Sequence, residues 1–148
     1  MEPSFRGGMV NRVAELLAHH ASAEAPAPRP LSWQSTRRAF RIAGHGLVDA
    51  WLREPHLRLH TYAAACVLIA GYACRLSRAE WMWICFAIGL VLFAEVMNTA
   101  IERTVDLAVG LRPDPLARYV KDVAAGCVLV AVIIAVTVGL MTFLPHLH

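Results

Sequence analysis

Apolar residues gather into long stretches along most of this chain. Three regions carry them, near residues 57–75, 80–106 and 122–143. Each is long enough for a membrane-spanning helix, which needs about 20 mostly apolar residues. The pattern therefore predicts three transmembrane helices, the second of which is longer than the hydrocarbon core and continues into the cytoplasm.

A different pattern comes before the first apolar stretch. Within residues 32–54, Phe40, Leu47, Val48 and Trp51 recur at helical spacing, while arginines supply a polar side. This arrangement is typical of an amphipathic helix that lies in the membrane interface. Residues 1–30 end in a proline-rich linker and are predicted to form a flexible tail. Residues 31–148 then form one membrane domain.

Composition supports this reading. The chain has 148 residues, of which 57% are hydrophobic and 17% are charged. The charged fraction is below the roughly 25% that is typical of soluble domains, and the high hydrophobicity excludes intrinsic disorder as the main state. We therefore expect an all-α membrane protein.

The cations predict its orientation. Seven of the 14 lysines and arginines precede the first predicted span, Arg58 lies at its start, and four more lie between residues 103 and 121. Only Arg75 and Arg78 flank the connection between the first two spans. By the positive-inside rule, the N-terminus and the second connection are cytoplasmic and the C-terminus lies outside.

The candidate chemistry lies in the second span. Glu95, Asn98, Glu102 and Asp106 follow one another at intervals of three and four residues, so they share one face of a helix. An ionisable residue inside a span costs about 2.5–3.5 kcal/mol on insertion scales, which favours a functional role. A structural seam of interhelical hydrogen bonds suits Asn98 but suits two glutamates less well.

Further polar residues flank the spans. Glu54 precedes the first span, and Lys121, the only lysine, stands with Asp122 before the third. Mg²⁺ binds one or two protein carboxylates together with substrate phosphates, and a lysine can contact phosphate as a point charge. A deeper carboxylate could accept a proton from a lipid hydroxyl. These residues suggest phosphoryl transfer to a lipid alcohol, although their spacing is equally compatible with a cation-binding or transport site.

The second-span motif resembles that of a known family. Residues 95–102 read Glu-Val-Met-Asn-Thr-Ala-Ile-Glu and are followed by Val105 and Asp106. This stretch is similar to the signature of the bacterial integral-membrane diacylglycerol kinases and undecaprenol kinases. Blocks at residues 39–47, 51–60 and 116–126 agree in the same order, so the resemblance covers about residues 36–144.

The resemblance implies both an assembly and a reaction. The assembly is a homotrimer in the bacterial inner membrane, with active sites shared between protomers; the reaction transfers the γ-phosphate of ATP to a lipid hydroxyl. Glu95 would be the catalytic base, assisted by Asn98, and Glu54 and Glu102 would hold Mg²⁺ on the ATP phosphates. The remaining implied contacts are Lys121 and Asp122 with ATP, and Arg58 and Glu95 with the lipid.

This chain departs from the family's sequence pattern at two places, one of which concerns the binding of nucleotide and the other the identity of the acceptor lipid. Residues 112–115 read Arg-Pro-Asp-Pro where many members have a Glu-Tyr-His-like sequence, which leaves the nucleotide contacts of loop 107–118 open. Arg58 and His60 are closer to the undecaprenol-kinase branch. Phosphorylation of diacylglycerol to phosphatidate is the expected activity, and undecaprenol phosphorylation is the alternative. A non-catalytic membrane protein with an acidic structural or ion-binding seam is the third reading.

Overall fold

A computed structural model describes residues 33–110 and 113–147. The chain divides into two compact units, Met1–Arg37 and Arg38–His148, and only the last five residues of the first unit are described. The predicted tail and linker, residues 1–30, lie outside the described residues.

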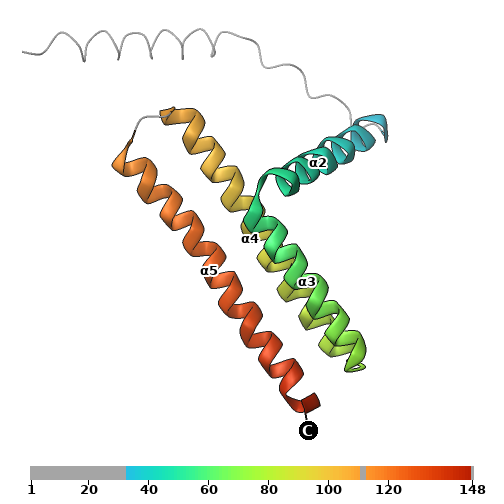
Figure 1. The fold of residues 1–148 in the computed structure, drawn as a ribbon. Helices are drawn as coiled ribbons and strands as arrows, with labels where there is room; N and C mark the ends of the chain where they lie inside the picture. The colour runs from blue at the N-terminus through green and yellow to red at the C-terminus, as the bar shows by residue number, and fades with distance from the viewer. Residues whose placement is uncertain (1–32, 111–112, 148) are drawn as a thin grey trace, which may run out of the picture. The chain divides into compact units, whose positions relative to one another are not determined.

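Helices account for almost all of the described chain (Figure 1). Their order is α2 (Trp33–Arg53), α3 (Pro55–Ala73), α4 (Arg78–Val109) and α5 (Pro115–Phe143), followed by the 3-10 turn η1 (Leu144–Leu147). No strand occurs within residues 33–110 or 113–147. The predicted all-α class is confirmed, and each predicted helical region is observed as a helix. The last helix begins at Pro115, before the predicted span, because the Asp114 carboxylate caps it by accepting from the Ala117 N–H at 2.8 Å.

Helix α2 is amphipathic, as predicted. It has 21 residues, and Phe40, Leu47 and Val48 are more than half exposed. The charged side chains of this helix are mostly arginines. An exposed apolar stripe and a basic opposite side suit a helix that lies in a bilayer interface.

Helix α4 packs against both α3 and α5 within the unit Arg38–His148. Its contact with α5 is the more extensive, and the two helices run side by side in Figure 1. Small residues line these contacts: Ala87, Ala124 and Ala131 are each at most 5% exposed, beside Ile84 at 2%. Small side chains allow helices to approach closely, which is how packing stabilises helix pairs where no water is displaced.

The turn between α3 and α4 is tightly built. The Leu76 N–H donates to the Gly71 carbonyl at 3.2 Å, and the Arg75 N–H donates to the Tyr72 carbonyl, with Arg75 at φ 55°. This pair of bonds is a Schellman motif, which satisfies the last carbonyls of α3. Ser77 and Glu80 then form a capping box at the start of α4.

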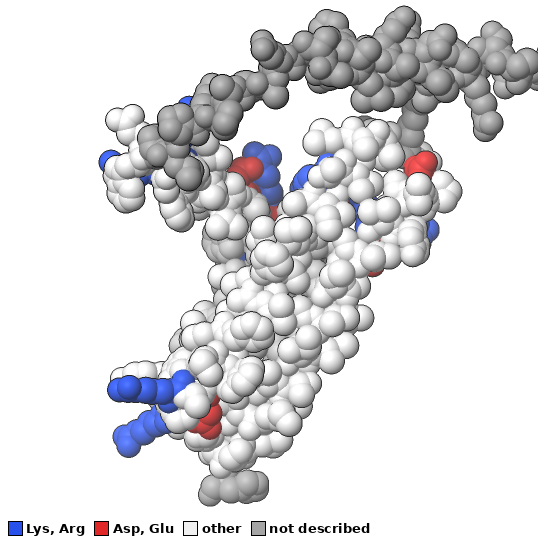
Figure 2. Space-filling model, turned by 180° about the vertical axis from the view of Figure 1, so that it is seen from behind, with Lys and Arg blue, Asp and Glu red and all other residues white. Residues whose placement is uncertain are grey.

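Two segments are long and apolar enough to cross a membrane. They are Arg78–Val109 and Pro115–His146, with mean hydropathies of 2.0 and 2.8. Helix α3 does not meet the same criterion, since Arg58 and two histidines occupy its first two turns. Figure 2 shows a broad uncharged surface between charged side chains at the two ends of these helices. Large apolar side chains of these helices are exposed, including Phe93 at 64% and Met141 at 75%. Such a surface needs lipid or another protein to cover it.

Close packing at Gly71 provides a test of the turn. A Cβ atom there would lie 3.0 Å from Cη2 of Trp81 and 3.1 Å from Cδ1 of Leu76. We expect Gly71→Val to lower stability by about 1–3 kcal/mol through overpacking, measured as thermal unfolding in detergent micelles. Gly44→Val is the control, because nothing lies within 4 Å of its Cβ position. Equal unfolding temperatures for wild type and Gly71→Val would contradict this packing.

Candidate active site

The predicted acidic face is present on α4. Glu95 is buried at 5% exposure, Asn98 and Glu102 are half-buried, and the Asp106 side chain is 47% exposed. Exposure therefore rises along this face from the middle of the helix towards its C-terminal end. Glu95 is thus the most buried residue of this face.

Asn98 forms a hydrogen bond with Glu102, and its other polar side-chain atom has no partner among the described residues. Its Nδ2 donates to Oε1 of Glu102 at 3.0 Å. Because a carboxylate can only accept, this bond fixes which end of the amide faces Glu102. The other end, Oδ1, is buried with no hydrogen-bond partner in the described chain. An unsatisfied buried acceptor costs about 1–3 kcal/mol, so this oxygen is available to a donor brought in by a ligand.

Two ion pairs bring other helices to the same face. Arg103 donates from Nη2 to Oε1 of Glu54, the residue that joins α2 to α3. Lys121 on α5 pairs with Asp106 on α4, with Nζ 2.5 Å from Oδ1. The fold thus places Glu54 beside the residue that follows Glu102, and it places Lys121 at the exposed end of the acidic face.

A polar hollow lies where α4 ends and α5 begins. It encloses about 430 Å³ and contains Asp106, Asp114, Arg118, Lys121 and Asp122 among its lining residues. The two residues predicted to contact ATP, Lys121 and Asp122, therefore line one hollow. The Asp122 side chain is 72% exposed, and its Oδ2 lies 3.9 Å from Nε of Arg118.

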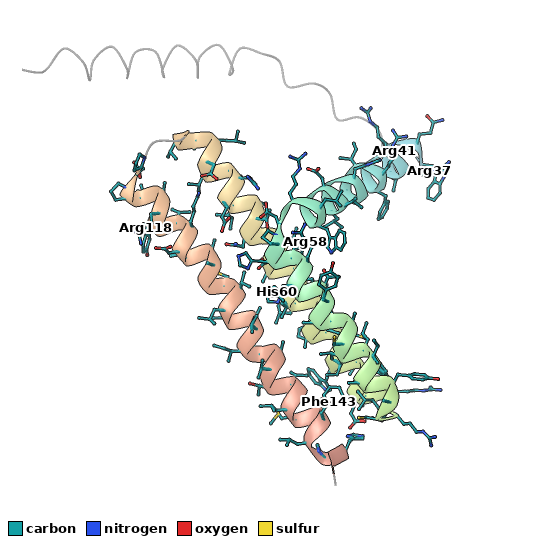
Figure 3. All side chains as sticks on the ribbon, in the orientation of Figure 1. Arg37, Arg41, Arg58, His60, Arg118 and Phe143 are labelled. Atoms are coloured by element: carbon teal, nitrogen blue, oxygen red, sulfur yellow. The ribbon has the colours of Figure 1, made fainter. Side chains whose placement is uncertain are left out.

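Arg58 forms a hydrogen bond that joins α3 to α2. Its Nη1 donates to the carbonyl oxygen of Leu52 at 2.8 Å, which ties the first turn of α3 to the last turn of α2. Figure 3 labels Arg58 at this junction, with His60 just beyond it on α3. The predicted contact of Arg58 with the lipid stays a prediction.

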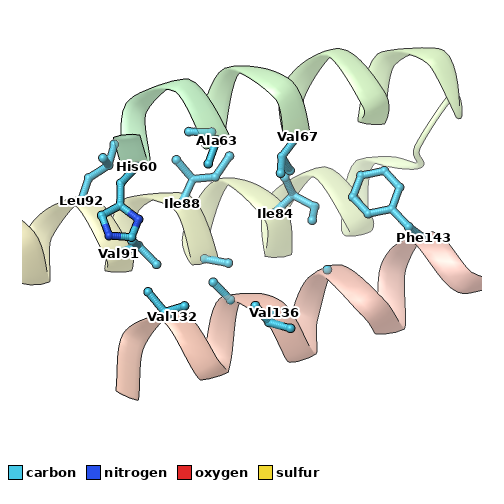
Figure 4. Close-up of a pocket in the computed structure, with 14 residues that line it drawn as sticks. His60, Ala63, Val67, Ile84, Ile88, Val91, Leu92, Val132, Val136 and Phe143 are labelled. Carbon is cyan, nitrogen blue, oxygen red and sulfur yellow. The ribbon is translucent and has the colours of Figure 1, made fainter. Parts of the chain in front are cut away.

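An apolar cavity lies between α3, α4 and α5 (Figure 4). It encloses about 260 Å³, and His60 is the one polar side chain among the residues that line it. Val91 and Leu92 line it one helical turn before Glu95. The cavity can therefore receive an apolar chain close to the buried carboxylate.

The carboxylates fit a hard cation that arrives with its own ligands. The described residues contain no group of three His, Cys, Asp or Glu side chains that could hold a metal by themselves. Mg²⁺ does not need such a group when it is bound to polyphosphate, because one or two protein carboxylates and water complete its shell. Glu54 and Glu102 supply oxygen ligands of this kind, and Glu54 is already placed beside a cation.

Sequence reasoning missed Arg103. It was counted only as a cytoplasmic cation, whereas the structure places it in contact with a candidate metal ligand. A signal was present, since Arg103 stands between Glu102 and Asp106 in the acidic motif. The apolar cavity and the pairing of Asp106 with Lys121 were also missed, because neither can be read from one segment alone.

Comparison with known proteins identifies the family. The sequence profile described as "Prokaryotic diacylglycerol kinase" matches residues 41–143. An undecaprenol kinase of Bacillus subtilis is 43% identical over 110 residues, which cover 74% of this chain and 89% of that protein. A diacylglycerol kinase of Synechocystis is 38% identical over 109 residues, covering 74% and 62% of the two chains. A diacylglycerol kinase of Escherichia coli is 27% identical over 112 residues, covering 74% and 91%. The family predicted from the acidic motif is confirmed, and the chain belongs to the prokaryotic diacylglycerol kinases.

Proposed function

We propose that this chain transfers the γ-phosphate of ATP to the hydroxyl group of a membrane lipid alcohol. The observation that carries the proposal is the buried carboxyl group of Glu95 on an otherwise apolar stretch of α4. The same helix face continues through Asn98 and Glu102 to the ion pairs at its exposed end. A lipid hydroxyl and a water-soluble nucleotide can meet only at such a boundary between apolar and polar surroundings.

Glu95 is the proposed catalytic base. A carboxylate can act as a general base towards a hydroxyl group that is held within hydrogen-bond reach of it. It would take the proton of the lipid hydroxyl as the oxygen attacks phosphorus. Asn98 would orient the reacting groups through its free Oδ1, while its Nδ2 stays bound to Glu102.

Glu54 and Glu102 are the proposed ligands of Mg²⁺, and Lys121 with Asp122 is the proposed contact region for ATP. When bound, Mg²⁺ neutralises charge on the phosphates. The ammonium group of Lys121 lies in the polar hollow, where it can contact a phosphate oxygen. Asp122 stands next to it in the chain and would support its position.

The proposed setting is the bacterial inner membrane. We infer that α3 is a third span beside α4 and α5, with its polar first turns at the cytoplasmic surface and α2 lying in the interface. The cation bias supports a cytoplasmic N-terminus and an external C-terminus. Large exposed apolar side chains on α4 and α5 support packing against lipid and against further copies in a homotrimer with shared sites.

Diacylglycerol is the proposed acceptor, and undecaprenol is the second candidate. The diacylglycerol kinases of Synechocystis and Escherichia coli support the first. The Bacillus subtilis undecaprenol kinase, at 43% identity, supports the second, as does the pair Arg58 and His60. Both acceptors present a primary hydroxyl on a long apolar body, which the cavity beside Glu95 could receive.

The acceptor can be measured directly. Purified protein in mixed micelles, supplied with Mg²⁺ and labelled ATP, is expected to transfer label to diacylglycerol or to undecaprenol in the organic phase. The preferred lipid is the one with the higher kcat/KM. Transfer to neither lipid would reject the kinase proposal and favour a structural or ion-binding role for the acidic face.

Replacing Glu95 tests the catalytic base. Glu95→Gln keeps the shape of the side chain but removes the proton acceptor, so we expect kcat to fall at least about 100-fold. The control is Glu80→Gln, which changes an acid at the opposite end of the same helix. Wild-type turnover in Glu95→Gln would exclude Glu95 as the base.

Replacing Glu102 tests the metal assignment. Glu102→Gln should raise the KM for MgATP roughly tenfold, with a smaller effect on the KM for lipid. Raising free Mg²⁺ should recover part of the activity, since the lost ligand weakens binding and leaves the base in place. An unchanged KM for MgATP, with Glu80→Gln as control, would remove Glu102 from the metal site.

A further inference from the structure

Arg103 forms an ion pair with Glu54, one of the proposed metal ligands. Its guanidinium donates to Oε1 of Glu54, although the two residues are 49 positions apart in the chain. The Glu54 side chain is only 18% exposed, whereas that of Arg103 is 62% exposed. The carboxylate is therefore held in place by the fold, and its cation reaches it from the solvent side.

Lys121, the proposed phosphate-binding residue, is also engaged in an ion pair. Lys121 pairs with Asp106, which lies one helical turn beyond Arg103 on α4. Both groups that are proposed to receive metal–ATP are thus neutralised by residues of the same chain. Ligand binding at this end of α4 must exchange these ion pairs for new ones.

Because of the charges involved, a metal ion can replace Arg103 at Glu54 only when it arrives together with phosphate. A divalent cation that approaches Glu54 alone meets the repulsion of the guanidinium, and displacing Arg103 would leave that side chain without its carboxylate. A cation that arrives on polyphosphate brings the compensating anion with it. A guanidinium binds phosphate oxygens through two parallel hydrogen bonds, so Arg103 has a new partner within reach of its long, exposed side chain.

We propose that Arg103 moves from Glu54 to the phosphates of ATP when metal–nucleotide binds, so that this site accepts a divalent cation only together with nucleotide. In the free protein, Arg103 is the cation that neutralises Glu54. In the complex, it becomes a nucleotide contact. This inference rests on the proposed function, because it requires Glu54 to be a metal ligand.

Binding of Mn²⁺ in the absence of nucleotide tests whether Arg103 excludes a free divalent cation. It is measured by electron paramagnetic resonance on the full chain in micelles. With the competing guanidinium removed, Arg103→Gln should bind Mn²⁺ roughly threefold to tenfold more tightly than wild type in the absence of nucleotide. The same variant should bind MgATP more weakly, with a higher KM for MgATP and little change in the KM for lipid.

Two further variants make the test specific. Arg103→Lys keeps the charge but not the two parallel bonds, so it should exclude free Mn²⁺ as wild type does and recover only part of the MgATP affinity. Arg78→Gln removes an arginine from the opposite end of the same helix and should change neither affinity. Thermal unfolding of each variant in micelles shows whether the fold is retained.

The outcomes separate this inference from the proposed function. If wild type phosphorylates lipid but Arg103→Gln binds free Mn²⁺ no more tightly than wild type, the inference is overturned and the kinase proposal stands. If Arg103→Gln binds both Mn²⁺ and MgATP more weakly, Arg103 only maintains the site, and the inference is again overturned. If wild type neither binds MgATP nor transfers phosphate, the proposed function itself fails.

Discussion

The structure depends on the cost of placing a carboxyl group among apolar side chains. Glu95 is 5% exposed in the middle of α4, and no described cation pairs with its carboxyl group, so a charge there is poorly stabilised. A ligand that binds beside the carboxyl group and forms a hydrogen bond with it would lower that cost. The polar residues that follow on the same face, Asn98 and Glu102, form a path from this buried group to the exposed end of the helix.

Charges at that exposed end are balanced within the chain. Arg103 neutralises Glu54 and Lys121 neutralises Asp106, so each of these two carboxylates is balanced by a cation of the same chain. Binding of a nucleotide is then an exchange of partners, and its free energy is the difference between two sets of ion pairs. Such an exchange favours ligands that bring both signs of charge, as a metal–polyphosphate complex does.

The apolar cavity and the polar hollow lie on either side of Glu95 along α4. Towards the C-terminal end of α4 lie the polar hollow and its ion pairs; towards the N-terminal end lies the cavity lined by Val91 and Leu92. A lipid chain in the cavity and a nucleotide in the hollow would approach the carboxyl group from opposite directions. The exposed apolar residues of α4 and α5 are compatible with this arrangement only in a bilayer or an assembly.

Local sequence determined the helices and the acidic face. Long apolar stretches and helical spacing act within one segment, so the approximate positions of α2 to α5 and the alignment of Glu95, Asn98 and Glu102 could be predicted. The cap at Asp114, which starts α5 before the predicted span, was not part of that prediction. Tertiary structure alone decided the partners of Glu54 and Lys121, the burial of Oδ1 of Asn98 without a partner among the described residues, and the cavity near Glu95. These features depend on how α3 and α5 pack against α4, and the periodicity of a single helix does not specify which rotation or height its neighbours adopt.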